Sequence, residues 1–162
     1  DIGLAVEIPE TGETLEENAL IKARYVAEKF KVNCFADDSG LEVEALNGAP
    51  GVFSARYAGP KKNDGENVAK LLKNMNGKTN RKACFKTVIA LISNTETHLF
   101  TGEVYGEITH KPIGSNGFGY DPVFVPQGYS QTFAQMAPEQ KNQLSHRARA
   151  VEKLAAFLGK KK

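Results

Sequence analysis

Two long β-prone segments, separated by only four residues, constrain the fold of this chain more than any other feature. They span residues 82–93 and 98–109, and the polar segment Asn94-Thr95-Glu96-Thr97 lies between them. Side chains in the second segment alternate, with Phe100 and Val104 on the face opposite to Thr101 and Glu103. A period of two is typical of strands, and a short polar connection favours a hairpin. The sequence therefore predicts a long antiparallel hairpin.

Three amphipathic segments predict helices that cover this hairpin. The first opens with Thr14-Leu15-Glu16-Glu17, a capping-box pattern, and its apolar stripe continues to Phe30. The second spans residues 63–75, and the third is predicted from about Pro138 to Leu158. Helices that flank a sheet indicate an α/β fold, and 162 residues suffice for one domain with its own core.

Two shorter apolar segments predict further strands. Residues 33–36 are expected to form a buried strand that ends in the polar turn Asp37-Asp38-Ser39-Gly40. Residues 123–125 are expected to form another short strand, directly after the glycine-rich segment 114–122. Polar residues at a strand end are well placed to reach a ligand, so both segments are candidate parts of a site.

Composition and charge exclude several classes of protein. The 21 Lys and Arg residues nearly balance the 19 Asp and Glu residues, and a net charge of +2 is too small for general attraction to nucleic acids or membranes. No apolar stretch approaches the ~18 residues that a membrane span needs, and no signal-peptide pattern opens the sequence. Cys34 and Cys84 lie in separate apolar runs, as reduced thiols do. We therefore expect a cytoplasmic protein without a nucleic-acid or membrane partner.

Adjacent carboxylates are the first candidate for chemistry. Asp37 and Asp38 are hard oxygen ligands of the kind that Mg²⁺ prefers. Neighbours in an extended chain point to opposite sides, so only one of them enters the site directly unless the turn redirects the other. A solvated Asp-rich turn explains the same residues equally well.

Charged residues near the first predicted helix form a second candidate group. Glu10 lies before the helix, and Lys22, further along it, could contact a phosphate. The alternatives are structural: acidic residues in a first helical turn complement the helix dipole, and a lysine on a partly apolar face often extends its ammonium group to solvent.

The glycine-rich segment and the last predicted helix supply the remaining candidates. Phe118, Tyr120 and Asp121 could stack on a flat base and hydrogen-bond its edge, although a loop whose aromatic residues enter the core is the alternative. Three donors, Lys141, His146 and Arg147, are spaced so that they could meet a phosphate or a base carbonyl, although a solvated basic face is the default explanation.

Taken in order along the chain, these segments resemble the inosine triphosphate pyrophosphatase family. The matching residues are Glu10-Thr11-Gly12, Glu17-Asn18-Ala19, Lys22-Ala23, Ala36-Asp37-Asp38-Ser39-Gly40-Leu41, Gly51, Ser54-Ala55-Arg56-Tyr57-Ala58-Gly59, Gly117-Phe118-Gly119-Tyr120-Asp121-Pro122, Lys141 and Ser145-His146-Arg147. Four motifs in the family's order cover nearly the whole chain, and the Ser145-His146-Arg147 match disfavours an enzyme for pyrimidine or ordinary nucleotides.

The resemblance implies Mg²⁺-dependent hydrolysis of non-canonical purine nucleoside triphosphates (ITP, dITP and XTP) to the monophosphate and pyrophosphate. It also implies an elongated mixed sheet flanked by helices, two lobes with a nucleotide cleft between them, and a homodimer. By position, Asp38 is the implied catalytic base, and Glu10, Asp37 and Asp38 are the implied metal ligands. The implied substrate-binding residues are Lys22, Ser39, Phe118, Gly119, Tyr120, Asp121, Lys141, His146 and Arg147. Among these, His146 and Arg147 are expected to select bases with a 6-oxo group.

One part of the family's pattern does not occur in this sequence. Family members open with a strand and a turn of the form Thr/Ser-x-Asn-x-x-Lys that holds the triphosphate, and no such pattern precedes Glu10. We therefore expect residues 1–162 to form a single domain that lacks this N-terminal strand and phosphate-binding motif. An inactive nucleotide-binding or dimerising fragment of such an enzyme is the alternative to an active pyrophosphatase.

Overall fold

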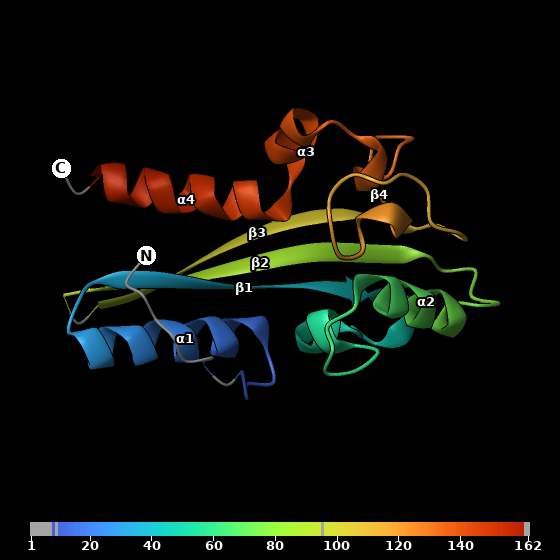
Figure 1. The fold of residues 1–162 in the computed structure, drawn as a ribbon. Helices are drawn as coiled ribbons and strands as arrows, with labels where there is room; N and C mark the ends of the chain where they lie inside the picture. Colours follow the sequence, from blue (N-terminus) through green and yellow to red (C-terminus); the bar gives the residue numbers. More distant parts are fainter. Residues whose placement is uncertain (1–7, 9, 95, 161–162) are drawn as a thin grey trace.

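A four-stranded sheet in the order β1-β2-β3-β4 forms the centre of the computed structural model, which describes residues 8, 10–94 and 96–160 (Figure 1). The strands are β1 (Cys34–Val43), β2 (Lys82–Ser93), β3 (Glu96–Ile108) and β4 (Phe124–Pro126). The helices are α1 (Leu15–Phe30), α2 (Asp64–Asn74), α3 (Pro138–Leu144) and α4 (His146–Lys160), with short 3₁₀ helices η1 (Glu44–Leu46), η2 (Gly51–Arg56), η3 (Asp121–Val123) and η4 (Phe133–Gln135). None of the described helices is both long and apolar enough to cross a membrane.

The predicted hairpin is confirmed as β2 and β3, which pair in register from Lys82 opposite Glu107 to Ser93 opposite Glu96. The second strand begins two residues earlier than expected. Asn94 adopts a φ of 49°, a left-handed conformation that asparagine tolerates, so the chain turns more tightly than the four polar residues suggested.

The strand β1 is longer than predicted, and the expected turn at Asp37–Gly40 is wrong. All ten residues of β1 pair with β2, from Cys34 opposite Ile92 to Val43 opposite Ala83. Continuous pairing with a long central strand overrides the local turn preference of Asp, Ser and Gly. Asp37 and Asp38 therefore lie inside a strand, where their side chains point to opposite faces of the sheet.

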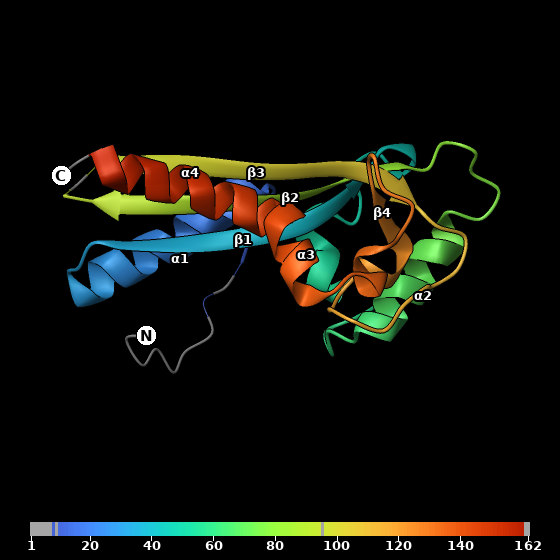
Figure 2. The same cartoon turned by 90° about the horizontal axis from the view of Figure 1, so that it is seen from above.

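Helices cover both faces of the sheet, α1 on one and α4 on the other (Figures 1 and 2). The alternation of β2 supplies both contacts, because Val88 and Ala90 face α1 while Ile89 and Leu91 face α4. The side chains buried between α1 and the sheet are Leu15, Ala19, Ala23, Val88 and Ala90, and those buried between α4 and the sheet are Ile89, Leu91, Ala150 and Leu154.

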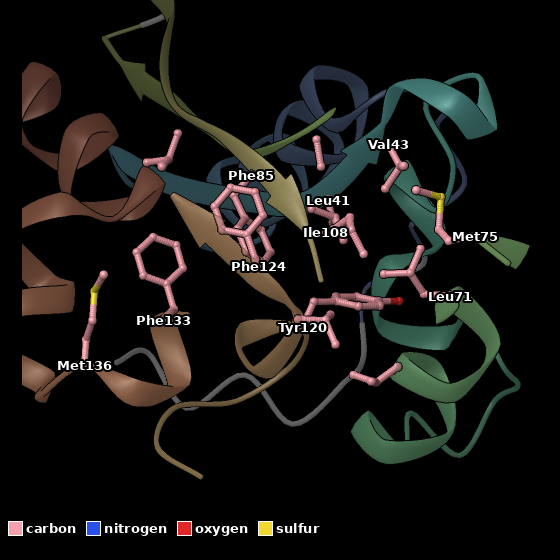
Figure 3. Close-up of a cluster of buried hydrophobic side chains, with 14 residues drawn as sticks. Leu41, Val43, Leu71, Met75, Phe85, Ile108, Tyr120, Phe124, Phe133 and Met136 are labelled. Atoms are coloured by element: carbon pink, nitrogen blue, oxygen red, sulfur yellow. The ribbon is translucent and has the colours of Figure 1, made fainter. Parts of the chain in front are cut away.

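The largest hydrophobic cluster lies at the other end of the sheet, where α2, β4, η3 and η4 meet it (Figure 3). Phe85 of β2 is its centre, and its ring meets Phe124 edge to face with centroids 4.6 Å apart. Leu41 and Leu71, from β1 and α2, are completely buried beside it. This end holds most of the buried aromatic surface and anchors the glycine-rich segment 114–122.

The predicted α/β class, an elongated sheet with flanking helices, is confirmed. The expectation that the sheet is mixed does not hold for the described strands, because every neighbouring pair is antiparallel. Each connection returns the chain to the end of the sheet that it left, including the long one from Val43 to Lys82 that carries α2. Such connections produce antiparallel neighbours.

The last predicted helix is divided in two. Ser145 adopts an extended backbone (φ −66°, ψ 154°) between α3 and α4, and its Oγ accepts a hydrogen bond from the Ala148 amide at 3.1 Å. Serine is a favoured N-cap, so this residue ends one helix and starts the next. The break changes the direction of the chain and places His146 and Arg147 in the first turn of α4, against the sheet.

Candidate active site

On the α1 face of the sheet, β1 and α1 bring two carboxylates to one lysine. Lys22 Nζ lies 3.5 Å from Asp38 Oδ1 and 3.4 Å from Glu10 Oε1. The regular spacing of α1 directs Lys22 toward β1, and Arg56 of η2 holds the Glu10 backbone through a hydrogen bond of 3.4 Å to its carbonyl. Three residues that lie far apart in the predicted segments therefore meet at one point.

The Asp38 carboxyl is the most perturbed acid of this group. The residue is only 8% exposed. Burial raises the pKa of its carboxyl, Lys22 lowers it and Glu10 raises it, and the net result is a pKa of about 6. Its Oδ2 atom is buried and has no hydrogen-bond partner among the described residues. A buried carboxylate with one free oxygen and a pKa near neutrality is suited to accept a proton.

The opposite face of β1 carries a second group of polar residues. Asp37 forms an ion pair with Arg147 of α4, and the Arg147 guanidinium also donates to Ser39 Oγ at 3.4 Å. Ser39 shares a hydrogen bond of 2.7 Å with Thr87 of β2. The structure thus brings Ser39 and Arg147 together but places Asp37 across the sheet from Asp38 and Glu10.

The glycine-rich segment presents one aromatic ring to solvent and buries the other. Phe118 is 70% exposed, and Lys141 Nζ lies 4.3 Å from its ring centroid. The Asp121 carboxylate is 3% exposed, and its Oδ2 accepts from the Phe118 amide at 3.1 Å and from Lys141 Nζ at 2.5 Å. An exposed ring beside a buried acid and a cation can stack on a flat ligand and recognise its edge.

Tyr120 belongs to the core. This agrees with the alternative prediction that aromatic residues of the glycine-rich segment enter the core. It is 4% exposed, and its hydroxyl donates to the Ser54 carbonyl of η2 at 2.6 Å. The neighbouring Gly119 amide donates to Asp64 Oδ2 at the start of α2, at 2.9 Å. These two bonds tie the segment to η2 and α2 and fix where Phe118 lies.

His146, in the first turn of α4, stacks on the Phe85 ring with centroids 4.8 Å apart. Burial, together with the charges of Arg147 and Lys141, lowers its pKa to about 4. Its Nδ1 is buried without a hydrogen-bond partner among the described residues. At neutral pH the imidazole is therefore uncharged, with one ring nitrogen able to accept a hydrogen bond and the other able to donate one.

Glu10 and Asp38 are the pair that best fits a hard divalent cation. Both offer carboxylate oxygens, and Asp38 Oδ2 is buried without a partner. In the described part of the chain, no three His, Cys, Asp or Glu residues are grouped as a metal site. Asp37 is held by Arg147 on the other face, so its predicted ligand role requires that ion pair to open.

A separate surface pocket of about 830 Å³ contains none of the predicted site residues. Its lining includes Glu42, Cys84 and Tyr105, from β1, β2 and β3, and Tyr129, from the segment after β4. The candidate site is therefore defined by two groups of charged and aromatic side chains, on opposite faces of the sheet, rather than by this concavity.

Sequence reasoning assigned no role to three residues that support the site. Asn18 is completely buried in α1, and its Oδ1 accepts from the Gly12 amide at 2.7 Å. Arg56 holds the Glu10 carbonyl, and Asp64 holds Gly119. Asn18 and Arg56 fall within matched motifs, so the pattern marked their positions, but only the fold shows their partners.

Comparisons with known proteins place the chain in one family. The model of the Ham1 family matches residues 1–157. The dITP/XTP pyrophosphatase of Flavobacterium psychrophilum is 56% identical over 97% of this chain and 83% of its own length, and that of Porphyromonas gingivalis is 54% identical over 98% and 82%.

Solved structures agree with these relatives. The Staphylococcus aureus Ham1 protein superposes with a TM-score of 0.94 at 47% identity, over 98% of this chain and 83% of that one. A HAM1 protein from Coxiella burnetii gives a TM-score of 0.92 at 44% identity, over 96% and 81%. The resemblance drawn from the motifs is confirmed, and the chain belongs to the Ham1 family.

Proposed function

We propose that this protein hydrolyses non-canonical purine nucleoside triphosphates, namely ITP, dITP and XTP, to the nucleoside monophosphate and pyrophosphate. The observation that carries the proposal is the buried Asp38 carboxyl, which has one free oxygen and lies beside Lys22 and Glu10. Relatives about half identical over nearly the whole chain bear the name dITP/XTP pyrophosphatase, which supports the same reaction here.

Asp38 acts as the general base in this proposal. Its free Oδ2 accepts the proton of the attacking water, and a carboxyl with a pKa near the working pH does so effectively. Lys22 compensates the negative charge of Asp38 and Glu10, and it offers an ammonium group to phosphate oxygens.

Glu10 and Asp38 would hold the Mg²⁺ ion, with Asp37 as the further ligand that the resemblance implies. Bound Mg²⁺ neutralises the triphosphate and orients it for attack. In its present pairing, Asp37 instead fixes the Arg147 guanidinium next to Ser39, which suits Arg147 and Ser39 for substrate contact.

Recognition of the base is assigned to the other side of the sheet. Phe118 supplies an exposed stacking surface, and Lys141 and Asp121 lie directly beside it. His146 and Arg147 supply donors for a 6-oxo group. Adenine carries an amino group there and would leave these donors unpaired. Gly119 and Tyr120 contribute by holding the loop.

The wider setting follows from the family resemblance. We propose a homodimer in the cytoplasm, with the nucleotide as substrate, no nucleic-acid or membrane partner, and one domain over residues 1–162. The small net charge of +2 supports the expected absence of a general nucleic-acid partner.

Pyrophosphate release from ITP, dITP, XTP, ATP and GTP, measured with and without Mg²⁺, tests the proposal. Asp38→Asn is the diagnostic variant, and Glu28→Gln, which removes an exposed carboxylate further along α1, is the control. We expect turnover of the first three substrates to exceed that of ATP and GTP, and Asp38→Asn to lower it by roughly 10²- to 10⁴-fold. A folded wild-type chain without turnover would favour the inactive-fragment alternative.

A further inference from the structure

Asn18 is a buried polar residue next to the proposed general base, Asp38, and the proposed function gives it no role. It lies in the first turn of α1, is 0% exposed, and its side chain interacts with Asp38 of β1. A buried amide must satisfy its donors and its acceptor or lose stability, so its partners define its role.

The orientation of the Asn18 amide is fixed by the backbone. Its Oδ1 accepts a hydrogen bond of 2.7 Å from the Gly12 amide, a group that can only donate. The oxygen must therefore point to Gly12, and Nδ2 must point the other way. Space at this contact is limited, because a Cβ on Gly12 would lie 2.8 Å from Asn18 Oδ1 and 2.6 Å from Glu17 Cβ.

The other end of the amide faces Asp38. The Asn18 side chain favours the ionised form of the Asp38 carboxyl, although Nδ2 lies outside direct hydrogen-bond geometry. Asn18 Nδ2 is a buried donor and Asp38 Oδ2 a buried acceptor, and each lacks a partner among the described residues. A buried donor and a buried acceptor that lack other partners are typical of a functional site, where polar groups are kept in place for a ligand or a reaction.

We propose that Asn18 is a positioning residue that holds the Asp38 carboxylate and the Glu10–Gly12 segment in one fixed arrangement. This inference rests on the proposed function and deepens it. The Oδ1 bond to Gly12 ties down the segment that carries Glu10, and Nδ2 orients the carboxylate that takes the proton. Asn18 thus links the two carboxylates that share Lys22, without contacting the substrate itself.

Two variants separate the two ends of the amide. Asn18→Asp keeps an oxygen for the Gly12 amide but replaces the NH₂ donor toward Asp38 with a second oxygen. Asn18→Leu removes both the acceptor and the donor while keeping a side chain of similar volume. Thr14→Ala is the matched control, because it removes the cap bond of 3.1 Å to the Glu17 amide and weakens the same helix start. Thermal unfolding of all three reports how much fold stability each loses.

The expected results are specific to positioning. Both Asn18 variants lower kcat for dITP by about 10- to 100-fold with a much smaller change in KM, and both weaken Mn²⁺ binding to the nucleotide-free protein, measured by electron paramagnetic resonance, by a similar factor. Hydrogen exchange at the Gly12 amide becomes faster in Asn18→Leu but stays slow in Asn18→Asp. Thr14→Ala lowers the unfolding temperature and leaves kcat unchanged.

Other outcomes overturn the proposal. If wild type is active and both Asn18 variants keep kcat and Mn²⁺ affinity within twofold, Asn18 has no positioning role. If Thr14→Ala lowers kcat as much as they do, the effect comes from helix stability alone. If wild type is inactive on every triphosphate, the proposed function fails, and unchanged Mn²⁺ affinity and Gly12 exchange in Asn18→Leu would then reject the positioning role independently.

Discussion

Substitution of Gly102 by alanine should displace the start of α4. We expect this change to lower both the stability and the kcat/KM of the enzyme, although Gly102 lies outside the proposed site. Gly102 lies in β3 directly beneath α4, and a Cβ there would lie 2.0 Å from the His146 carbonyl oxygen and 2.4 Å from the Ala150 nitrogen. Both atoms belong to the helix backbone, so no side-chain rotation can relieve the overlap.

The size of the displacement follows from these distances. Ordinary contact begins near 3.4 Å, so the first turn of α4 has to move away from β3 by about 1.4 Å. Two side-chain bonds on either side of Gly102 resist that movement, from Arg149 to the Glu103 carbonyl at 2.9 Å and from Lys153 to the Thr101 carbonyl at 2.7 Å. Overpacking of this kind costs about 1–3 kcal/mol of folding stability.

The same movement carries His146 and Arg147 away from Phe85 and Ser39. Because a misplacement of roughly 1 Å can cost 10²-fold in rate, we expect Gly102→Ala to lower kcat/KM for dITP by about 100-fold.

The control is Gly159→Ala, at the other end of α4, where an added Cβ meets no atom within 4 Å. This variant should keep full activity and gain up to about 1 kcal/mol of stability. Steady-state kinetics and urea unfolding of both variants provide the test. Wild-type values of kcat/KM and stability in Gly102→Ala would refute the reasoning.

Two further predictions concern stability and are checked by urea unfolding. The pKa of His146 is lowered to about 4 in the folded protein, mainly by burial. As the pH falls below ~6.5, the unfolded chain therefore binds a proton at this histidine before the folded chain does. The free energy of unfolding should decrease by about 3 kcal/mol between about pH 6.5 and pH 4. His146→Gln should remove most of this slope, and an unchanged slope would contradict the assignment. Tyr120→Phe leaves the Ser54 carbonyl without its donor and should cost about 1–3 kcal/mol at neutral pH; a loss below 0.5 kcal/mol would contradict a buried bond there.

Local sequence patterns predicted helices and strands well where the periodicity of the sequence agrees with the long-range pairing in the fold. The 82–93 strand and the helix that ends at Phe30 were predicted at their observed bounds. Prediction failed where long-range contacts override local preference. Asp37–Gly40 looks like a turn but is held in β1 by pairing with β2, and Ser145 interrupts a helical pattern because its side chain caps the helix that follows.

Much of the candidate site was predicted residue by residue, but its division over two faces was not. Strand alternation indicated that Asp37 and Asp38 point apart, yet only the fold shows that one meets Arg147 and the other Lys22. Composition likewise cannot tell that Phe118 is exposed and Tyr120 buried, because this depends on the partner that Ser54 offers from a distant helix.

The products formed from dITP test the central claim most directly. The wild-type chain, incubated with dITP and Mg²⁺, is analysed by ³¹P nuclear magnetic resonance, with Asp38→Asn run in parallel. The account predicts dIMP and pyrophosphate in equal amounts from wild type, and almost none from the variant. Formation of dIDP and phosphate, equal turnover by Asp38→Asn, or intact dITP after incubation with a folded chain would contradict it.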